Sequence, residues 1–120
     1  MAYILLVDDN EDLIDNLRLI LEMEGYQVRA APSAIDAVEV LKQNLPVMIL
    51  ADIVMAGENG YDLCKYVKGN KRYDGIPFIF ISALTTPHEV DLGLELGADD
   101  YVTKPFAIDE FLSVIHRYLG

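Results

Sequence analysis

The chain has 120 residues, of which 52% are hydrophobic, and its 20 Asp and Glu against 9 Lys and Arg give a formal net charge of -11. This length and apolar content suit one folded domain with a real core, and they argue against a disordered chain. The negative charge repels phosphate backbones and anionic lipid, so we expect no direct nucleic-acid binding and no membrane binding. The single cysteine, Cys64, excludes an internal disulfide and a cysteine-cluster metal site, and we expect it to be a small buried residue.

The amino-terminal segment predicts a strand followed by a helix. It has no basic start and no cleavage site, and its apolar run is too short to span a membrane, so we expect a cytoplasmic protein. The strand is predicted over Tyr3 to Val7 and stops at Asp8 and Asp9. Asn10 is expected to cap a helix that ends at Gly25.

The next segment predicts a second strand, a second helix and a third strand. The second strand is expected over residues 27–30, and Ser33 opens a helix through about Leu41. Residues 48–51 are continuously apolar, which is typical of a strand covered on both faces of a parallel sheet. This third strand ends abruptly at Asp52, a carboxylate at the rim of the expected core.

The middle of the chain predicts a helix from a cap at Asn59 to about Lys68, and a fourth strand over residues 77–82. The sequence Thr-Pro-His-Glu from Thr86 is a strong helix start, because it offers a cap, a proline at the first position and an acidic partner. Gly93 inside this helix costs about 1 kcal/mol relative to Ala. We therefore expect this helix to be the easiest to shift.

The last segment predicts a short fifth strand over residues 101–103 and, after Lys104-Pro105, a final helix. Its inward residues are expected to be Ile108, Phe111, Leu112, Ile115 and Leu119. Five strands alternating with five helices predict an α/β fold with a parallel sheet covered on both faces. We expect one domain over residues 1–120, a flavodoxin-like doubly wound sheet with strand order 2-1-3-4-5.

Polar side chains stand at the ends of four predicted strands: Asp8 and Asp9, Asp52, Ser82 and Lys104. In this strand order all of them converge at one rim of the sheet. Three crowded carboxylates repel one another, and Mg²⁺ is the simplest remedy because it binds one or two carboxylates together with phosphate oxygens. Asp52 is then a candidate nucleophile toward phosphorus, with Lys104 and Ser82 neutralising charge on the phosphoryl oxygens.

Each of these residues taken singly also fits a structural role. Asp8 and Asp9 could cap the first helix, Ser82 could be a strand-end hydroxyl, and Lys104 a solvated charge. Their joint placement at four strand ends favours the functional interpretation.

Four motifs carry a resemblance to a known family: VDDNED at 7–12, ILADIVM at 49–55, FISA at 80–83 and GADDYVTKPF at 97–106. With these motifs the chain resembles, over essentially its whole length, the response-regulator receiver domain of two-component signal transduction, in the CheY-like superfamily. The resemblance implies that Asp52 accepts a phosphoryl group from a sensor histidine kinase or a histidine phosphotransfer protein. It also implies an output through a downstream protein or a C-terminal effector domain, which the sequence does not identify.

The resemblance further implies roles for the other residues at the rim. Asp9, Asp52 and the backbone carbonyl of Val54 would hold Mg²⁺, with Asp8 acting through metal-bound water. Lys104 would pair with the phosphoryl group.

A switch is implied as well. Ser82 would turn toward the phosphoryl group, and Tyr101 would move inward with it, although Tyr101 is also consistent with packing alone. The Lys104-Pro105 bond is cis in the family. His88 and His116 are expected on helix surfaces away from the rim, as neither metal ligands nor phosphodonors.

The sequence departs from the family in two ways that affect the site. Ala56 stands after Met55 where proline is usual, which loosens the loop without removing a ligand. Val54 and Leu84 occupy two positions that are associated in the family with phosphoryl lifetime. Neither side chain can orient an attacking water, so we expect slow self-hydrolysis.

A third departure concerns assembly. The segment from Gly93 resembles receivers joined to winged-helix DNA-binding domains, in which basic residues commonly make ion pairs across a dimer. Val90, Asp109 and Val114 stand where such bases are expected, while Asp99 and Asp100 remain. Unpaired acids would then face each other across the dimer, so we do not expect that symmetric dimer.

Three functions compete. The leading one is a signalling switch that is not an enzyme in the usual sense, because its phosphorylated substrate is itself. A phosphohydrolase of the haloacid-dehalogenase type would carry Asp-x-Asp after its first strand, whereas Asp8 and Asp9 are adjacent. A flavodoxin-like flavin carrier would need a first loop that attracts phosphate, and this loop is acidic.

Overall fold

The computed structural model describes residues 2–55, 58–83 and 86–120. Its main element is a five-stranded parallel sheet in the order β2-β1-β3-β6-β7. The strands are β1 (Tyr3–Val7), β2 (Gln27–Ala31), β3 (Met48–Ala51), β6 (Phe78–Ser82) and β7 (Asp100–Thr103). A short antiparallel pair, β4 (Val54–Met55) and β5 (Glu58–Asn59), was not predicted. Without that pair the sheet has the predicted order 2-1-3-4-5.

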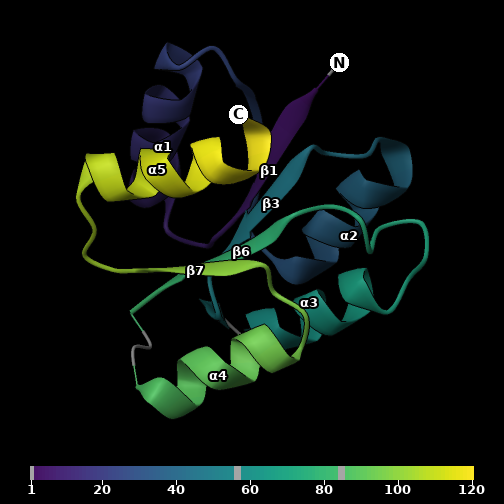
Figure 1. Cartoon of the computed structure of the whole chain (residues 1–120). Helices are drawn as coiled ribbons and strands as arrows, with labels where there is room; N and C mark the ends of the chain where they lie inside the picture. Colours follow the sequence, from purple (N-terminus) through teal and green to yellow (C-terminus); the bar gives the residue numbers. More distant parts are fainter. Residues whose placement is uncertain (1, 56–57, 84–85) are drawn as a thin grey trace.

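Helices cover both faces of the sheet. They are α1 (Glu11–Met23), α2 (Ala34–Gln43), α3 (Gly60–Lys68), α4 (Pro87–Glu95) and α5 (Ile108–Leu119). In Figure 1, α1 and α5 lie together on one side of the sheet, and α2, α3 and α4 lie on the other. The predicted doubly wound α/β class is therefore confirmed.

Local sequence signals set the starts of four helices, as predicted. The side chains of Asn10, Ser33, Asn59 and Thr86 each accept a backbone N–H of the following turn. At α4 the capping box is complete, because the Glu89 side chain also accepts the Thr86 backbone N–H. A cap of this kind stabilises a helix by about 1 kcal/mol.

Two buried layers flank the sheet. Strands β1, β3 and β6 are buried along their whole length, in keeping with their continuous apolar sequences. Phe78, Phe80 and Cys64 lie in the layer under α2 and α3, and Phe111 and Ile115 lie in the layer under α1 and α5. Cys64 is fully buried, as predicted. Each large side chain buried in this way contributes about 1.5–3 kcal/mol.

The prediction that Ile108 is buried in the core is wrong. Ile108 is 54% exposed, while Phe111 and Ile115 on the same helix are buried. Ile108 is the first residue of α5 and follows the exposed residues Pro105 and Ala107, beyond the carboxyl end of β7. The helix therefore reaches the core only from its second turn.

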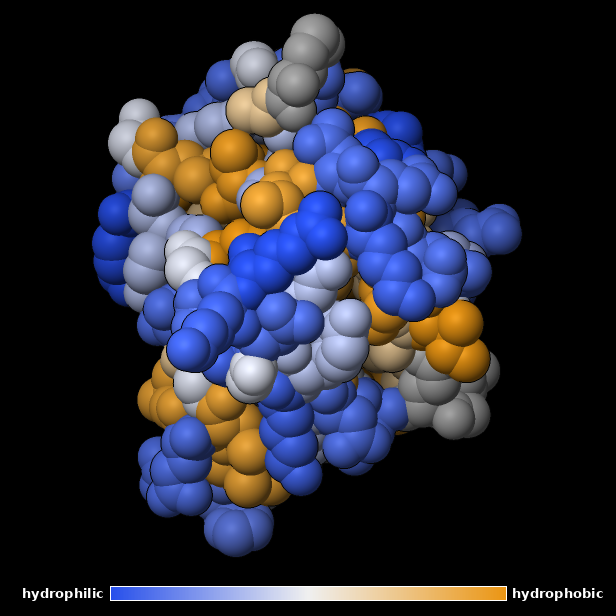
Figure 2. Space-filling view, turned by 90° about the vertical axis from the view of Figure 1, so that its right-hand side faces the viewer, coloured by the Kyte–Doolittle hydropathy of each residue, from blue (hydrophilic) through white to orange (hydrophobic). Residues whose placement is uncertain are grey.

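The surface over α2 and α3 is mixed in character. Figure 2 shows hydrophilic side chains running across this side of the molecule, with separate hydrophobic areas next to them. One such area is a shallow hollow of about 200 Å³ between α2 and α3, where Ile35 is 70% exposed. Across the described ranges, the helices are all too short or too polar to span a bilayer.

Gly60 generates the first prediction, because α3 starts against the backbone of the phosphoacceptor candidate. A β-carbon added at Gly60 would lie 2.1 Å from the Asp52 carbonyl oxygen, and a backbone atom cannot move aside cheaply. We expect Gly60→Ala to lower the free energy of unfolding by about 1–3 kcal/mol in urea denaturation. At Gly75 an added β-carbon meets open space, so Gly75→Ala should change stability by no more than about 0.5 kcal/mol. Equal stability of the two variants would contradict this account.

Candidate functional site

Three charged side chains from distant parts of the chain meet at the carboxyl edge of the sheet. Asp8 directly follows β1, Asp52 follows β3, and Lys104 follows β7. The Lys104 Nζ atom lies 3.2 Å from Asp8 Oδ2 and 3.3 Å from Asp52 Oδ2. A single ammonium group therefore bridges two carboxylates.

The second oxygen of each carboxylate is held by the backbone. Asp8 Oδ1 accepts the backbone N–H of Asn10 at 2.9 Å, and Asp52 Oδ1 accepts that of Ile53 at 2.7 Å. These bonds fix the orientation of both carboxylates. In Asp52 the Oδ2 atom is left facing Lys104.

The strands also fix the backbone under the site. Asp52 N–H donates to the Val7 carbonyl at 3.0 Å, and Lys104 N–H donates to the Ser82 carbonyl at 2.9 Å. The peptide bond between Lys104 and Pro105 is cis, as the family resemblance implied. The hydrogen bond to the Ser82 carbonyl thus holds the Lys104 backbone at the end of β7.

Asp8 is the most buried acid of the site, with a residue exposure of 6%. Burial raises the pKa of Asp8 above its usual value of 3.8, and the nearby Asp52 charge adds to the rise. The Asn10 N–H and the Lys104 ammonium oppose the rise. Keeping Asp8 ionised in the folded protein therefore costs free energy relative to the unfolded chain.

The predicted metal ligands differ in exposure. Asp9 is exposed beside Asp8, and the Val54 side chain is 60% exposed. An open hollow of about 280 Å³ is lined in part by Asp8 and Asp9, so ions and water can reach this end of the site. Among the residues that the structure describes, no three His, Cys, Asp or Glu side chains are grouped as a metal cluster. The oxygen atoms available to a metal ion are those of the Asp8 and Asp52 carboxylates, of the neighbouring Asp9 and of the backbone.

The predicted switch residues are in contact. Ser82 is buried at the end of β6, and Tyr101 is half-buried on the neighbouring strand β7. Burial raises the pKa of Tyr101 to about 12, and the nearby Ser82 hydroxyl opposes the rise. Tyr101 therefore stays protonated near neutral pH and can donate its hydroxyl proton.

Asp99 and Asp100, which lack the expected basic partners across a symmetric dimer, each contact a basic residue of their own chain. Asp99 Oδ2 lies 2.9 Å from Lys68 Nζ, and Asp100 Oδ2 lies 2.6 Å from Arg117 Nη1. Both acids therefore have a basic partner within their own chain. The expectation against a symmetric dimer is not tested by these contacts and stays a prediction.

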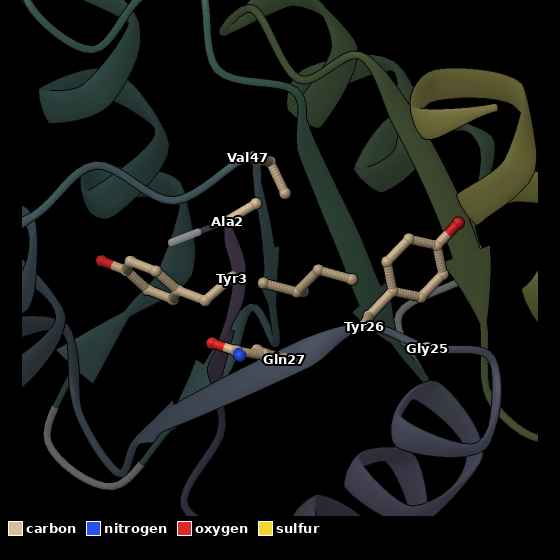
Figure 3. A pocket seen from close by; sticks show the side chains of 7 residues that line it. Ala2, Tyr3, Gly25, Tyr26, Gln27 and Val47 are labelled. Carbon is tan, nitrogen blue, oxygen red and sulfur yellow. The ribbon is translucent and has the colours of Figure 1, made fainter.

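The remaining candidates lie elsewhere. His116 contacts Glu24 at 3.1 Å, away from the rim, and His88 is exposed on α4. Leu84 and Ala56, to which the sequence assigned effects on lifetime and on the loop, lie outside the described residues. A hollow of about 300 Å³ opens at the amino-terminal ends of β1 and β2. In Figure 3 the rings of Tyr3 and Tyr26 extend in opposite directions around it, and it contains none of the predicted site residues.

Comparison with known proteins places the chain in a family. Residues 4–116 match the model of the response regulator receiver domain. The chain belongs to this family. This membership confirms the resemblance seen in the sequence and favours the signalling function over the phosphohydrolase and the flavin carrier.

Individual relatives agree with this assignment. The receiver domain is 40% identical to the response regulator SaeR of Staphylococcus aureus (strain USA300) over 119 residues, covering 99% of this chain and 51% of SaeR. It thus spans about half the length of that relative. A receiver domain of a signal transduction histidine kinase from Syntrophus aciditrophicus is 35% identical with a TM-score of 0.91, covering 99% and 90% of the two chains. The BeF3-activated receiver domain of Klebsiella pneumoniae RstA is 26% identical with a TM-score of 0.89, covering 98% and 97%.

Two contributions to the site could not be read from side-chain identity. The backbone N–H groups of Asn10 and Ile53 orient the two carboxylates, and any residue except proline could supply them. Tyr61, which contacts α4 from the start of α3, was also missed. Its position in the first turn of α3 gave no sign of a partner on another helix.

The raised pKa of Asp8 generates a prediction about stability. The folded receiver domain binds a proton at Asp8 more tightly than the unfolded chain, so stability falls as the pH rises from 3.8 through the folded pKa. Asp8→Asn should therefore raise the free energy of unfolding at pH 7. The advantage should shrink as the pH is lowered toward 3.8.

Urea denaturation at several pH values measures this effect. Asp15→Asn, which changes an exposed acid on α1, is the matched control and should show no such gain. A destabilised Asp8→Asn protein at pH 7 would show that the bond to Lys104 outweighs the cost of burial.

Proposed function

We propose that this receiver domain is a phosphorylation-dependent switch in which Asp52 accepts a phosphoryl group from the phosphohistidine of a sensor kinase or a phosphotransfer protein. The observation that carries the proposal is the Lys104 ammonium 3.3 Å from Asp52 Oδ2 at the end of the central strand. This arrangement offers a carboxylate nucleophile next to a fixed positive charge. The phosphorylated receiver acts on other proteins, and the receiver turns over no separate substrate.

In the transfer step, Asp52 Oδ2 attacks phosphorus. A P–O bond forms while the P–N bond to the donor histidine breaks, and the bonding electrons return to the histidine nitrogen. Phosphoryl transfer depends mainly on positioning and on neutralising the phosphoryl oxygens. The Ile53 N–H holds Oδ1 of Asp52 during attack, and Lys104 neutralises charge on the transferred group.

The oxygen donors around Asp52 fit Mg²⁺, which takes one or two carboxylates and retains several waters. Asp8 and Asp52 both contact the Lys104 ammonium group. Asp9 lies next to Asp8 at the open end of the site. We assign Asp9, Asp52 and the Val54 carbonyl as its ligands, with Asp8 acting through water. When bound, Mg²⁺ supplies positive charge to the phosphoryl oxygens.

The response passes through Ser82 and Tyr101. The Ser82 hydroxyl lies near Tyr101 and lowers its pKa, so turning this hydroxyl toward a phosphoryl group on Asp52 would weaken its interaction with Tyr101. Tyr101 then takes a new position against α4, which changes the face formed by α4, β7 and α5. A downstream protein or a C-terminal effector domain would bind this face. The length of SaeR, about twice that of this chain, is consistent with a C-terminal effector domain in that relative. We place the receiver domain in the cytoplasm.

Replacement of Asp52 is the direct test. With acetyl phosphate and Mg²⁺, wild-type protein should gain one phosphoryl group by intact-protein mass spectrometry, and Asp52→Asn should gain none. Asp62→Asn, which changes an exposed acid on α3, should be phosphorylated like wild type. Equal labelling of Asp52→Asn would remove Asp52 from its assigned role.

Phosphoryl lifetime is the second test. The Val54 side chain is apolar and exposed next to Asp52, so it cannot orient an attacking water. We expect slow decay of the phosphorylated protein, and Val54→Asn should accelerate it by up to about 100-fold, the lower range of a positioned polar group. Val54→Ala is the apolar control and should decay like wild type. Fast decay of wild-type protein would contradict the assignment.

A further inference from the structure

Three aromatic rings connect the start of α3 to Tyr101. The Tyr61 ring meets the Phe80 ring edge-on, with centroids 5.6 Å apart and an interplanar angle of 73°. Phe80 in turn contacts Tyr101 at 6.0 Å. Phe80 is fully buried, so Tyr61 and Tyr101 flank one fixed ring.

Tyr61 also binds α4 directly. Its hydroxyl donates a hydrogen bond of 3.1 Å to the Glu89 carbonyl in the first turn of α4. Burial raises the pKa of Tyr61, with a further rise from Glu89, so the phenol stays a proton donor near neutral pH. The bond joins two helices that Figure 1 shows on the same side of the sheet.

The other end of this connection reaches the phosphoacceptor. Gly60, the residue before Tyr61, donates its N–H to the Ile53 carbonyl at 2.7 Å. Its Cα leaves no room for a side chain against the Asp52 carbonyl. The first turn of α3 therefore follows any shift of the backbone at Asp52 and Ile53.

Helix α4 lies directly on the aromatic rings. A β-carbon at Gly93 would come within 3.1 Å of the Phe80 ring and 3.8 Å of the Tyr101 ring. Gly93 is buried there, and Glu89 lies one turn earlier on the same helix. The position of α4 is thus determined by Tyr61, Phe80 and Tyr101 together.

We propose that Tyr61 is a positioning residue that links Asp52 to α4 through α3, in addition to the link through Ser82 and Tyr101. This inference rests on the proposed function, because it concerns how phosphorylation at Asp52 is relayed. Its physical content is a hydrogen bond from Tyr61 to the Glu89 carbonyl whose strength differs between the unphosphorylated and phosphorylated states.

Tyr61→Phe tests the proposal, because it removes only the hydroxyl and keeps the ring against Phe80. The probe is beryllofluoride with Mg²⁺, and the readout is residue-resolved amide hydrogen exchange and chemical shift by NMR. Without the probe, amides of α4 should exchange about 2- to 12-fold faster in Tyr61→Phe, the effect of losing one ordinary hydrogen bond. With the probe, the chemical-shift changes that beryllofluoride induces over residues 90–95 should be at least twofold smaller in Tyr61→Phe than in wild type. The changes around Asp52 and Ser82 should be the same in both proteins.

Two further variants make the test specific. Tyr66 is on the same helix, 39% exposed, and its hydroxyl makes no hydrogen bond within the described ranges, so Tyr66→Phe should match wild type. Tyr101→Phe removes the other link. In that background Tyr61→Phe should still lower the α4 response, although by a different amount than in wild type, because both tyrosine rings contact Phe80.

Each remaining outcome has a defined meaning. A wild-type α4 response in Tyr61→Phe overturns the inference and leaves the proposed function intact. Loss of the Tyr61→Phe effect in the Tyr101→Phe background also overturns it, because only one connection then exists. If the wild-type protein takes up no beryllofluoride, the proposed function itself fails, and the inference fails with it.

Discussion

The ion pairs from one ammonium group to two carboxylates are the interaction on which this receiver domain depends. Removing two carboxylates from water is costly, and an opposite charge with good hydrogen bonds offsets that cost only in part. Lys104 and the two backbone N–H groups supply that offset for Asp8 and Asp52. Two negative charges and one positive charge leave the pocket short of positive charge. The pocket is therefore suited to bind a cation, and it keeps a carboxylate oxygen turned toward the place where a phosphoryl group would be neutralised.

The parallel sheet is what brings these residues together. Lys104 lies 96 residues from Asp8 and 52 from Asp52 along the chain. All strands of a parallel sheet end at the same edge, so side chains that follow different strands meet there without any local sequence relation. The strands beneath are buried on both faces, which keeps the site on a rigid base. Rigid support matters because phosphoryl transfer depends on the placement of charges more than on any other contribution of the protein.

Features that depend on local sequence were predictable, and features that depend on tertiary partners were not. The helix caps at Asn10 and Thr86 follow from residue type and spacing, and the strand ends follow from where apolar runs stop. By contrast, Asp99 contacts Lys68, which is 31 residues away in the sequence, and Tyr61 contacts Glu89, which is 28 residues away. Ile108 was misassigned because helical periodicity gives the direction of a side chain and not whether the core extends that far. The meeting of Asp8, Asp52 and Lys104 was predictable because each directly follows a strand, and the sheet topology then brings the three together.

The size of the individual contacts explains why a switch of this kind needs several of them. Moving a two-state equilibrium from 1:99 to 99:1 takes about 5.5 kcal/mol of differential binding. One hydrogen bond contributes only about 0.5–1.5 kcal/mol net. A hydrogen bond between Ser82 and Tyr101 therefore could not by itself account for the proposed shift of α4. A helix held by a capping box, by close packing of Gly93 on Phe80 and by two tyrosines responds fully only if several of these contacts change together. The proposed conformational change would then have to involve α3 as well as β7, because both elements supply contacts that hold α4.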